Sequence, residues 1–234
     1  MRVFAFLAFF ILQGCVVRVG DHTPSVVTQV SSLASPESSA LKLYKIMPSS
    51  QDVSEHSLQF KEYSSYVNRL LKMKGFELAG DHQVPEIIVF IGYGVGEPEE
   101  SYYSYDVPII GTAPTGSYSV STIGSTTTVT EHKALTVTGY SSHTRKKTSF
   151  TKHFEITAMS VAAYLENEEF QPIWETTVIS RGREYDLRYV FPYLVAASKD
   201  YIGRDSGRIV SVQIRQDNLV KRYIEGLESI VPST

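Results

Sequence analysis

The sequence has little cysteine, little tryptophan and no excess of positive charge. Its single cysteine among 234 residues, Cys15, excludes an intramolecular disulfide and a zinc site built from several thiolates. The formal net charge of −3 is not the basic balance that nucleic acid attracts, so we expect no nucleic-acid partner. Long hydrophobic runs are also missing, because the longest covers only residues 3–12 and a membrane-spanning helix needs about 20 residues.

That short apolar run lies at the N-terminus, directly after Arg2. One positive charge ahead of about 7–15 apolar residues is typical of a secretory signal. The run ends in Leu12-Gln13-Gly14-Cys15, which resembles the lipobox of bacterial lipoproteins. The resemblance implies cleavage between Gly14 and Cys15 and acylation of Cys15 with chains such as palmitate. Residues 1–14 are therefore the expected signal peptide, and the membrane is the expected partner through this lipid anchor.

The expected address is the bacterial cell envelope. Val16 follows the cysteine where an inner-membrane retention signal would place an aspartate. By resemblance to the sorting rule of enteric bacteria, this favours the outer membrane, with the protein domain facing the periplasm.

The rest of the chain divides into a linker and one domain. Half of residues 21–40 are Ser, Thr or Pro, so we interpret residues 15–40 as a lipidated N-terminus followed by a flexible tether. Residues 41–228 have the length and composition of a single domain. Within it, 20 of the 54 residues from 97 to 150 are Ser or Thr, which predicts exposed strands projecting from the core or a partly ordered loop.

Hydrophobic periodicity predicts the elements of this domain. A strand at 41–46 precedes a helix whose apolar residues recur every three or four positions, from a cap at Ser54 or Ser57 to a stop at Gly75. That helix buries Phe60, Tyr63, Val67, Leu70 and Leu71. The run at 86–93 is apolar enough for a strand buried on both faces and parallel to the first strand.

The C-terminal half predicts an antiparallel hairpin, a helix, a strand and a last helix. The hairpin pairs residues 153–165 with 172–181, and its first strand turns Met159, Val161, Ala163 and Leu165 to one face. Asp186 caps the following helix, which continues to residue 201. A β-α-β unit, a hairpin and an α-β unit in this order predict the α+β class, with a single mixed sheet and helices mainly on one face.

Short runs of this sequence are similar to a family of bacterial lipoproteins called domain of unknown function 4136. They are residues 58–63, 74–76, 91–98 and 186–192, followed by Tyr201-Ile202-Gly203 and Gly207. The similarity covers roughly residues 40 to 225. It implies a lipid-anchored domain, and it assigns no catalytic residue.

The motifs that suggest chemistry are weak. Gly92, Gly94 and Gly96 follow a strand, but their spacing departs from that of a dinucleotide loop and acidic residues come next, so close packing explains them better. The six histidines show no metal-ligand spacing on a predicted helix. We therefore expect no cofactor, no metal site and no catalytic residue.

Tyr102, Tyr103 and Tyr105 are the most suggestive surface residues. Clustered tyrosines are typical of protein interfaces, and the alternative is that these rings cover an adjacent sheet edge. The prediction is a non-enzymatic envelope lipoprotein that binds another envelope protein or gives structural support. An envelope hydrolase and a carrier of a small apolar ligand remain the alternatives.

Overall fold

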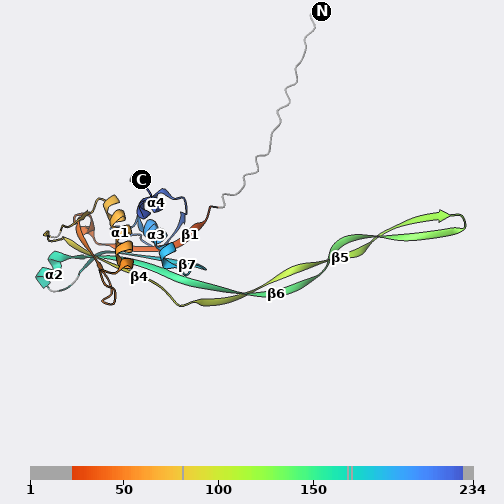
Figure 1. The fold of residues 1–234 in the computed structure, drawn as a ribbon, viewed down its shortest axis with the longest axis horizontal. Coiled ribbons are helices and arrows are strands. Elements are labelled where there is room, and N and C mark those ends of the chain that lie inside the picture. Colours follow the sequence, from red (N-terminus) through yellow and green to blue (C-terminus); the bar gives the residue numbers. More distant parts are fainter. Residues whose placement is uncertain (1–22, 81, 168, 170, 229–234) are drawn as a thin grey trace, which may run out of the picture.

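The computed structural model describes residues 23–80, 82–167, 169 and 171–228. It has a mixed α/β core from which one long two-stranded arm projects (Figure 1). The mixed sheet has eight strands in the order β3-β2-β4-β6-β7-β1-β8, and β5 pairs with β6 outside this path. The predicted signal peptide and Cys15 lie outside the described residues.

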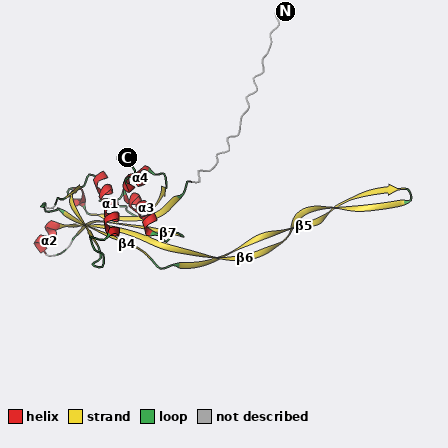
Figure 2. Cartoon of the chain, viewed as in Figure 1, coloured by secondary structure: helices red, strands yellow, loops and turns green. Residues whose placement is uncertain are grey.

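The core strands are β1 (Ser25–Ala34), β2 (Leu43–Pro48), β3 (Glu77–Leu78), β4 (Ile87–Val95), β7 (Pro172–Gly182) and β8 (Val210–Arg215). The arm consists of β5 (Glu99–Ile123) and most of β6 (Thr126–Ser160), whose last part joins the core. The helices are α1 (Leu58–Met73), α2 (Val161–Asn167), α3 (Leu187–Ser198) and α4 (Leu219–Glu225), with a short 3-10 turn at Pro36–Ser39. Figure 2 shows the contrast between the compact helical side of the core and the helix-free arm.

The first β-α-β unit is confirmed. Strands β2 and β4 are parallel, and α1 crosses between them. The Ser57 hydroxyl accepts a hydrogen bond from the Phe60 amide at 3.2 Å, which caps α1, and Gly75 follows with a φ of +82°. The five apolar residues predicted to face inward are all buried.

The tether prediction is wrong for residues 25–39. Strand β1 lies inside the sheet, antiparallel to β7 on one side and to β8 on the other. Its inward residues include Thr28 and Ser32, both almost fully buried. Their hydroxyls donate hydrogen bonds to the backbone carbonyls of Val212 and Tyr201, which offsets the cost of burying them.

Strand β4 is buried on one face only, which corrects the predicted two-sided burial. Ile87, Val89 and Ile91 are buried, whereas Ile88 and Phe90 are half-buried. The reason is that α1, α3 and α4 lie on the same side of the sheet, as Figure 1 shows, so these helices cover only one face of β4.

The predicted hairpin also needs one correction. Strand β6 ends at Ser160, and residues 161–167 form α2. The inward residues of β6 are Phe154, Ile156 and Ala158. The predicted strand face shared by Met159, Val161, Ala163 and Leu165 is wrong, because the strand ends before Val161. Ala162, Ala163 and Leu165 favour helix, and the register with β7 shifts next to Met159.

Helix α3 organises the middle of the core. The Asp186 carboxylate accepts a hydrogen bond from the Arg188 amide at 2.9 Å, which confirms the predicted cap, although the helix ends at Ser198 and not at residue 201. Phe191 stacks on Tyr63 with ring centroids 4.0 Å apart and meets Phe154 edge to face at 5.2 Å. These rings join α1, α3 and the sheet into one core.

The Glu86 carboxylate binds the start of β2 through two hydrogen bonds. Its lowered pKa leads to a pH-dependent prediction. The carboxylate accepts hydrogen bonds from the amides of Lys42 and Leu43 at 2.7 and 2.9 Å, and these bonds hold the pKa of Glu86 below its usual 4.5. A lowered pKa in the folded state stabilises the protein above the unfolded-state pKa, and this stabilisation is lost as the pH falls through the folded-state pKa.

We expect Glu86→Gln to melt at a lower temperature than the wild type at neutral pH, with the difference closing in acid below pH 4.5. Thermal melts over this pH range measure it, and a difference that stays constant in acid would contradict it.

Candidate functional site

The arm is the feature that distinguishes this molecule from an ordinary packed domain. Strand β5 has 25 residues, which at about 3.3 Å per residue gives an arm of about 80 Å. At its tip Ile123 pairs with Thr126 across a two-residue turn, in which Gly124 has a φ of +64°. Figure 1 shows the arm leaving one end of the core and contacting no other element along most of its length.

The arm is rich in β-branched residues, and the pairing of its two strands has two register shifts. Register shifts occur between Ile109 and Ile110 and between Pro114 and Tyr118. At the first shift, a Cβ on Gly111 would lie 2.6 Å from the Thr138 side chain, so a larger residue there would displace Thr138. These shifts twist the ribbon and leave the strands paired on both sides of each shift.

The outer half of the arm is amphipathic. Alternation along β6 places residues 129, 131, 133, 135 and 137 on one face, and the register brings 110, 118 and 120 of β5 to the same face. Two charged residues, Glu131 and Lys133, also lie on this face, which we call the outer apolar face. Its apolar residues are Ile110, Tyr118, Val120, Val129, Leu135 and Val137. Each is between 44% and 77% exposed, which shows that nothing in the described chain covers them.

The opposite face of the outer arm is mostly small and polar, apart from Ile123 at the tip. It carries Thr128, Thr130, His132, Ala134 and Thr136 of β6. The β5 residues paired with them are Gly111, Ala113, Ser119 and Ser121. One side of the ribbon is therefore richer in apolar side chains than the other, and no core lies beneath that side in the described chain.

The inner half of the arm carries the tyrosines predicted as partner contacts. Tyr103 and Tyr105 lie on one face with ring centroids 6.1 Å apart, and Tyr105 stacks on His143 at 5.8 Å. The Arg145 guanidinium lies 5.4 Å from the Tyr105 ring, a cation–π contact. Tyr102 points to the other face, where it pairs with Lys146. Tyr102 and Tyr103 are 67% and 44% exposed on the arm, so these two do not cover an edge of the core sheet.

The glycine run has a packing role. A Cβ on Gly92 would lie 2.7 Å from the Ser49 hydroxyl, and one on Gly94 would lie 2.6 Å from the His153 ring. Close approach of side chains over β4 therefore explains these glycines, as the sequence analysis inferred.

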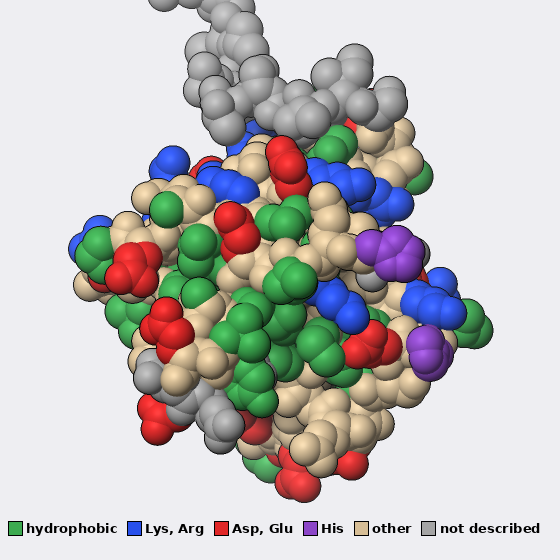
Figure 3. Space-filling model, turned by 90° about the vertical axis from the view of Figure 1, so that its left-hand side faces the viewer, with side chains coloured by type: hydrophobic (Ala, Val, Ile, Leu, Met, Phe, Trp, Pro, Cys, Tyr) green, Lys and Arg blue, Asp and Glu red, His purple; other side chains and the backbone are tan. Residues whose placement is uncertain are grey.

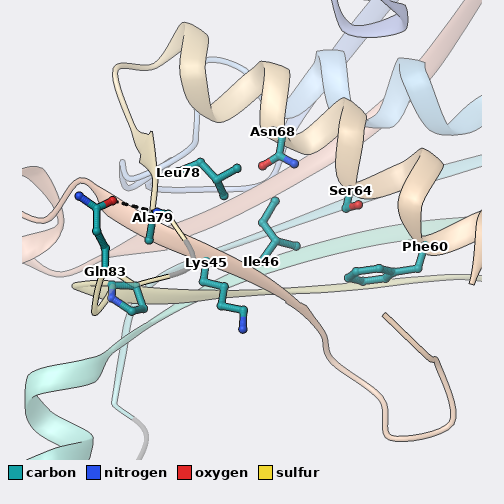
Figure 4. Close-up of a pocket in the computed structure, with 10 residues that line it drawn as sticks. Lys45, Ile46, Phe60, Ser64, Asn68, Leu78, Ala79 and Gln83 are labelled. Atoms are coloured by element: carbon teal, nitrogen blue, oxygen red, sulfur yellow. Dashed lines mark hydrogen bonds between the residues drawn. The ribbon is translucent and has the colours of Figure 1, made fainter. Parts of the chain in front are cut away.

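The core surface offers shallow hollows. One of about 390 Å³ lies between α1 and the β2–β3 edge, and Figure 4 shows Ile46, Phe60 and Asn68 around it. Its polar groups are engaged: the Asn68 side chain accepts a hydrogen bond from the Tyr44 hydroxyl, and the Gln83 side chain accepts one from the Gly80 amide. Among the described residues that line this hollow, Lys45 is the one titratable residue.

The end of the core that faces away from the arm has a mixed surface. Figure 3 shows hydrophobic side chains there interspersed with charged ones of both signs. In the part of the chain that the structure describes, no group of three or more His, Cys, Asp or Glu residues is placed to hold a metal ion. No helix within the described ranges is long and apolar enough to cross a membrane.

Comparison with known proteins gives little further guidance. No family model matches the sequence, and no curated protein matches it. Among solved structures, a PDZ domain protein from Parabacteroides distasonis is similar, with 12% sequence identity and a TM-score of 0.39. The match covers 82% of this chain and 40% of that chain. An identity and a TM-score this low do not indicate a function for this chain.

Proposed function

We propose that this protein is a bacterial envelope lipoprotein that is anchored through lipid on Cys15 and acts by binding, with its arm as the binding element. The observation that carries the proposal is the outer apolar face, which projects far from the core with its large side chains exposed. Large apolar side chains exposed together on one face of a projecting ribbon are typical of a surface that another molecule covers. We also assign the fold to the α+β class, with one mixed sheet and its helices mainly on one face.

The position of the arm relative to the N-terminus supports the combination of anchor and binding element. Ser25 at the start of β1 pairs with Arg215, and the same end of the sheet holds the Phe150–Gly182 pair, from which β6 continues into the arm. The residues between Cys15 and Ser25 span at most about 35 Å. An anchor on Cys15 therefore keeps the base of the arm near the membrane surface.

The anchor has a direct test in Cys15→Ser. We expect the wild-type protein from its native host to lack residues 1–14, to carry acyl mass and to sediment with membranes, because several acyl chains hold a protein there durably. The Cys15→Ser variant should lose the acyl mass and leave the membrane fraction. Intact-mass measurement and membrane fractionation check both results, and a soluble, unacylated wild type would refute the anchor.

The binding role can be tested at single residues of the arm. We expect a photo-cross-linking amino acid in place of Leu135, on the outer apolar face, to capture a protein in the native envelope. The neighbouring Thr136 is the matched control, because it is also exposed but lies on the opposite face. Gel analysis of the adducts checks this. Capture at neither position would contradict the binding role, and capture at Thr136 alone would contradict binding through the apolar face.

A further inference from the structure

We propose that the partner of the arm is a second copy of this chain, with β5 of one copy paired edge to edge with β6 of the next. This inference rests on the proposed role of the arm as the binding element and names what it binds. The inference follows from three features: the free edges of the arm, the opposite charges of its two strands, and the fact that the arm leaves the core at the same end as the N-terminus of β1.

Both edges of the arm have unpaired backbone groups. Among the described residues, β5 pairs with β6 alone, and β6 meets its other neighbours, β4 and β7, only from Phe150 onward. Each edge therefore presents a row of free amide and carbonyl groups that can accept another strand. An isolated two-stranded ribbon is at best marginally stable in water, so an arm of this length gains most from further strands beside it.

The two strands of the arm carry opposite charge. Strand β5 has three acidic residues, Glu99, Glu100 and Asp106, and no Lys or Arg. The arm portion of β6, residues 126–149, has four basic residues, Lys133, Arg145, Lys146 and Lys147, against one acid, Glu131. Within one copy the Lys146 ammonium already pairs with the Glu100 carboxylate at 2.5 Å. A β5 edge from a neighbouring copy would give the basic strand a second acidic neighbour.

The anchor fixes which strands of two copies can meet. The arm and the N-terminal end of β1 leave the core at the same end, so copies anchored in one membrane point their arms the same way. Two β6 strands side by side would then be parallel and would place Arg145, Lys146 and Lys147 of each copy next to their own equivalents. In contrast, β5 beside β6 is antiparallel, as it is within one copy, and joins opposite charges.

This pairing also aligns the apolar residues of neighbouring copies. All copies present the outer apolar face to the same side, so Ile110 of one copy lies in the row that holds Leu135 and Val137 of the next. Strands about 4.8 Å apart bring such side chains into contact. Because the contact joins two different edges, it repeats from copy to copy and builds a ring or a filament of several copies, not a closed pair.

Disulfide trapping in the native host tests the pairing with full-length protein. Cells would express two differently tagged chains: one with Ser104→Cys on β5, the other with Ser142→Cys, Thr144→Cys or Lys146→Cys on β6. The three β6 positions are two residues apart, so each corresponds to a different register between the strands of the two copies. All three registers keep the apolar residues of both copies on the same face. A disulfide needs the two Cα atoms within about 7 Å, which limits it to adjacent strands.

We expect disulfide-linked dimers carrying both tags from at least one of the three combinations, about tenfold more abundant than dimers in cells that express either variant alone. Glu175→Cys, on the exposed surface of β7, is the control for random collision. Dimers that form equally well with a single variant would show pairing of like strands and overturn the proposal. Yields no higher than the Glu175→Cys control in every combination would overturn it as well.

The photo-cross-link at Leu135 separates failure of this inference from failure of the proposed function. If Leu135 captures a different protein and no copy of this chain, the arm is a binding element but the partner is not a second copy. If Leu135 captures nothing and no disulfide dimers form, both proposals fail.

Discussion

Removing the arm is expected to leave the core folded. Glu99 pairs directly with Ser149, so an Asn-Gly turn in place of residues 100–148 closes the hairpin at its base. The ion pair between Glu99 and Arg181 at 3.1 Å remains, and its exposure limits its worth to about 0–1 kcal/mol in any case. The buried hydrophobic cluster contains no residue from 100–148. We therefore expect the free energy of unfolding to change by no more than about 1 kcal/mol.

Chemical denaturation of the shortened and full-length proteins measures this difference, with fluorescence of Trp174 as the probe. Trp174 is the single tryptophan, and it is buried in the core, far from the arm. An unfolded or much weakened variant would show that the arm is part of the folding unit, and the proposal of a separate binding element would then be wrong.

Phe191→Ala should have the opposite result, a large loss of stability. Phe191 is fully buried, and its ring contacts Tyr63, Phe154 and Tyr93, the last at 5.7 Å. Truncation removes the ring that joins α3 to α1 and the sheet, and it leaves a cavity among residues that other elements hold in place. Losses of about 3–5 kcal/mol are typical of such Phe→Ala changes, and in a domain of this size they lower the melting temperature by about 10 °C.

The neighbouring Tyr189 provides the matched control. It lies on the same helix but is 47% exposed, and the ring contact that involves it, with Tyr193, has centroids 5.9 Å apart. Tyr189→Ala should cost about 1 kcal/mol or less. Similar losses for the two variants would mean that the aromatic cluster is not the centre of the core.

Local signals explain why part of this fold could be predicted. Helix α1 has an apolar repeat, a serine cap and a glycine stop within its own sequence, and the Asp186 cap of α3 acts on a neighbouring residue. Strand β1 was missed because its buried positions include Thr28 and Ser32. Their burial depends on hydrogen bonds to Val212 and Tyr201, more than 160 residues away, which composition cannot reveal.

The candidate site was predicted in outline. The Ser/Thr-rich insert predicted exposed strands or a partly ordered loop, and the structure has strands. The tyrosines indicated either an interaction surface or a cover for a sheet edge, and an interaction surface stays a prediction. The outer apolar face escaped notice because its residues come from two strands of modest hydrophobicity, and they share a face only through a register with two shifts. Neither strand alone has the run of apolar residues that marks a buried element.

Co-purification of the full-length and shortened proteins from the native envelope tests the central claim most directly. The two proteins should have the same core stability, so any difference between them reports on the arm alone. We predict that tagged full-length protein, solubilised from membranes, retains a protein partner, whether a second copy or another chain, and that the shortened protein retains none. Equal recovery of the same partner by both proteins would contradict the account, because the binding surface would then lie on the core.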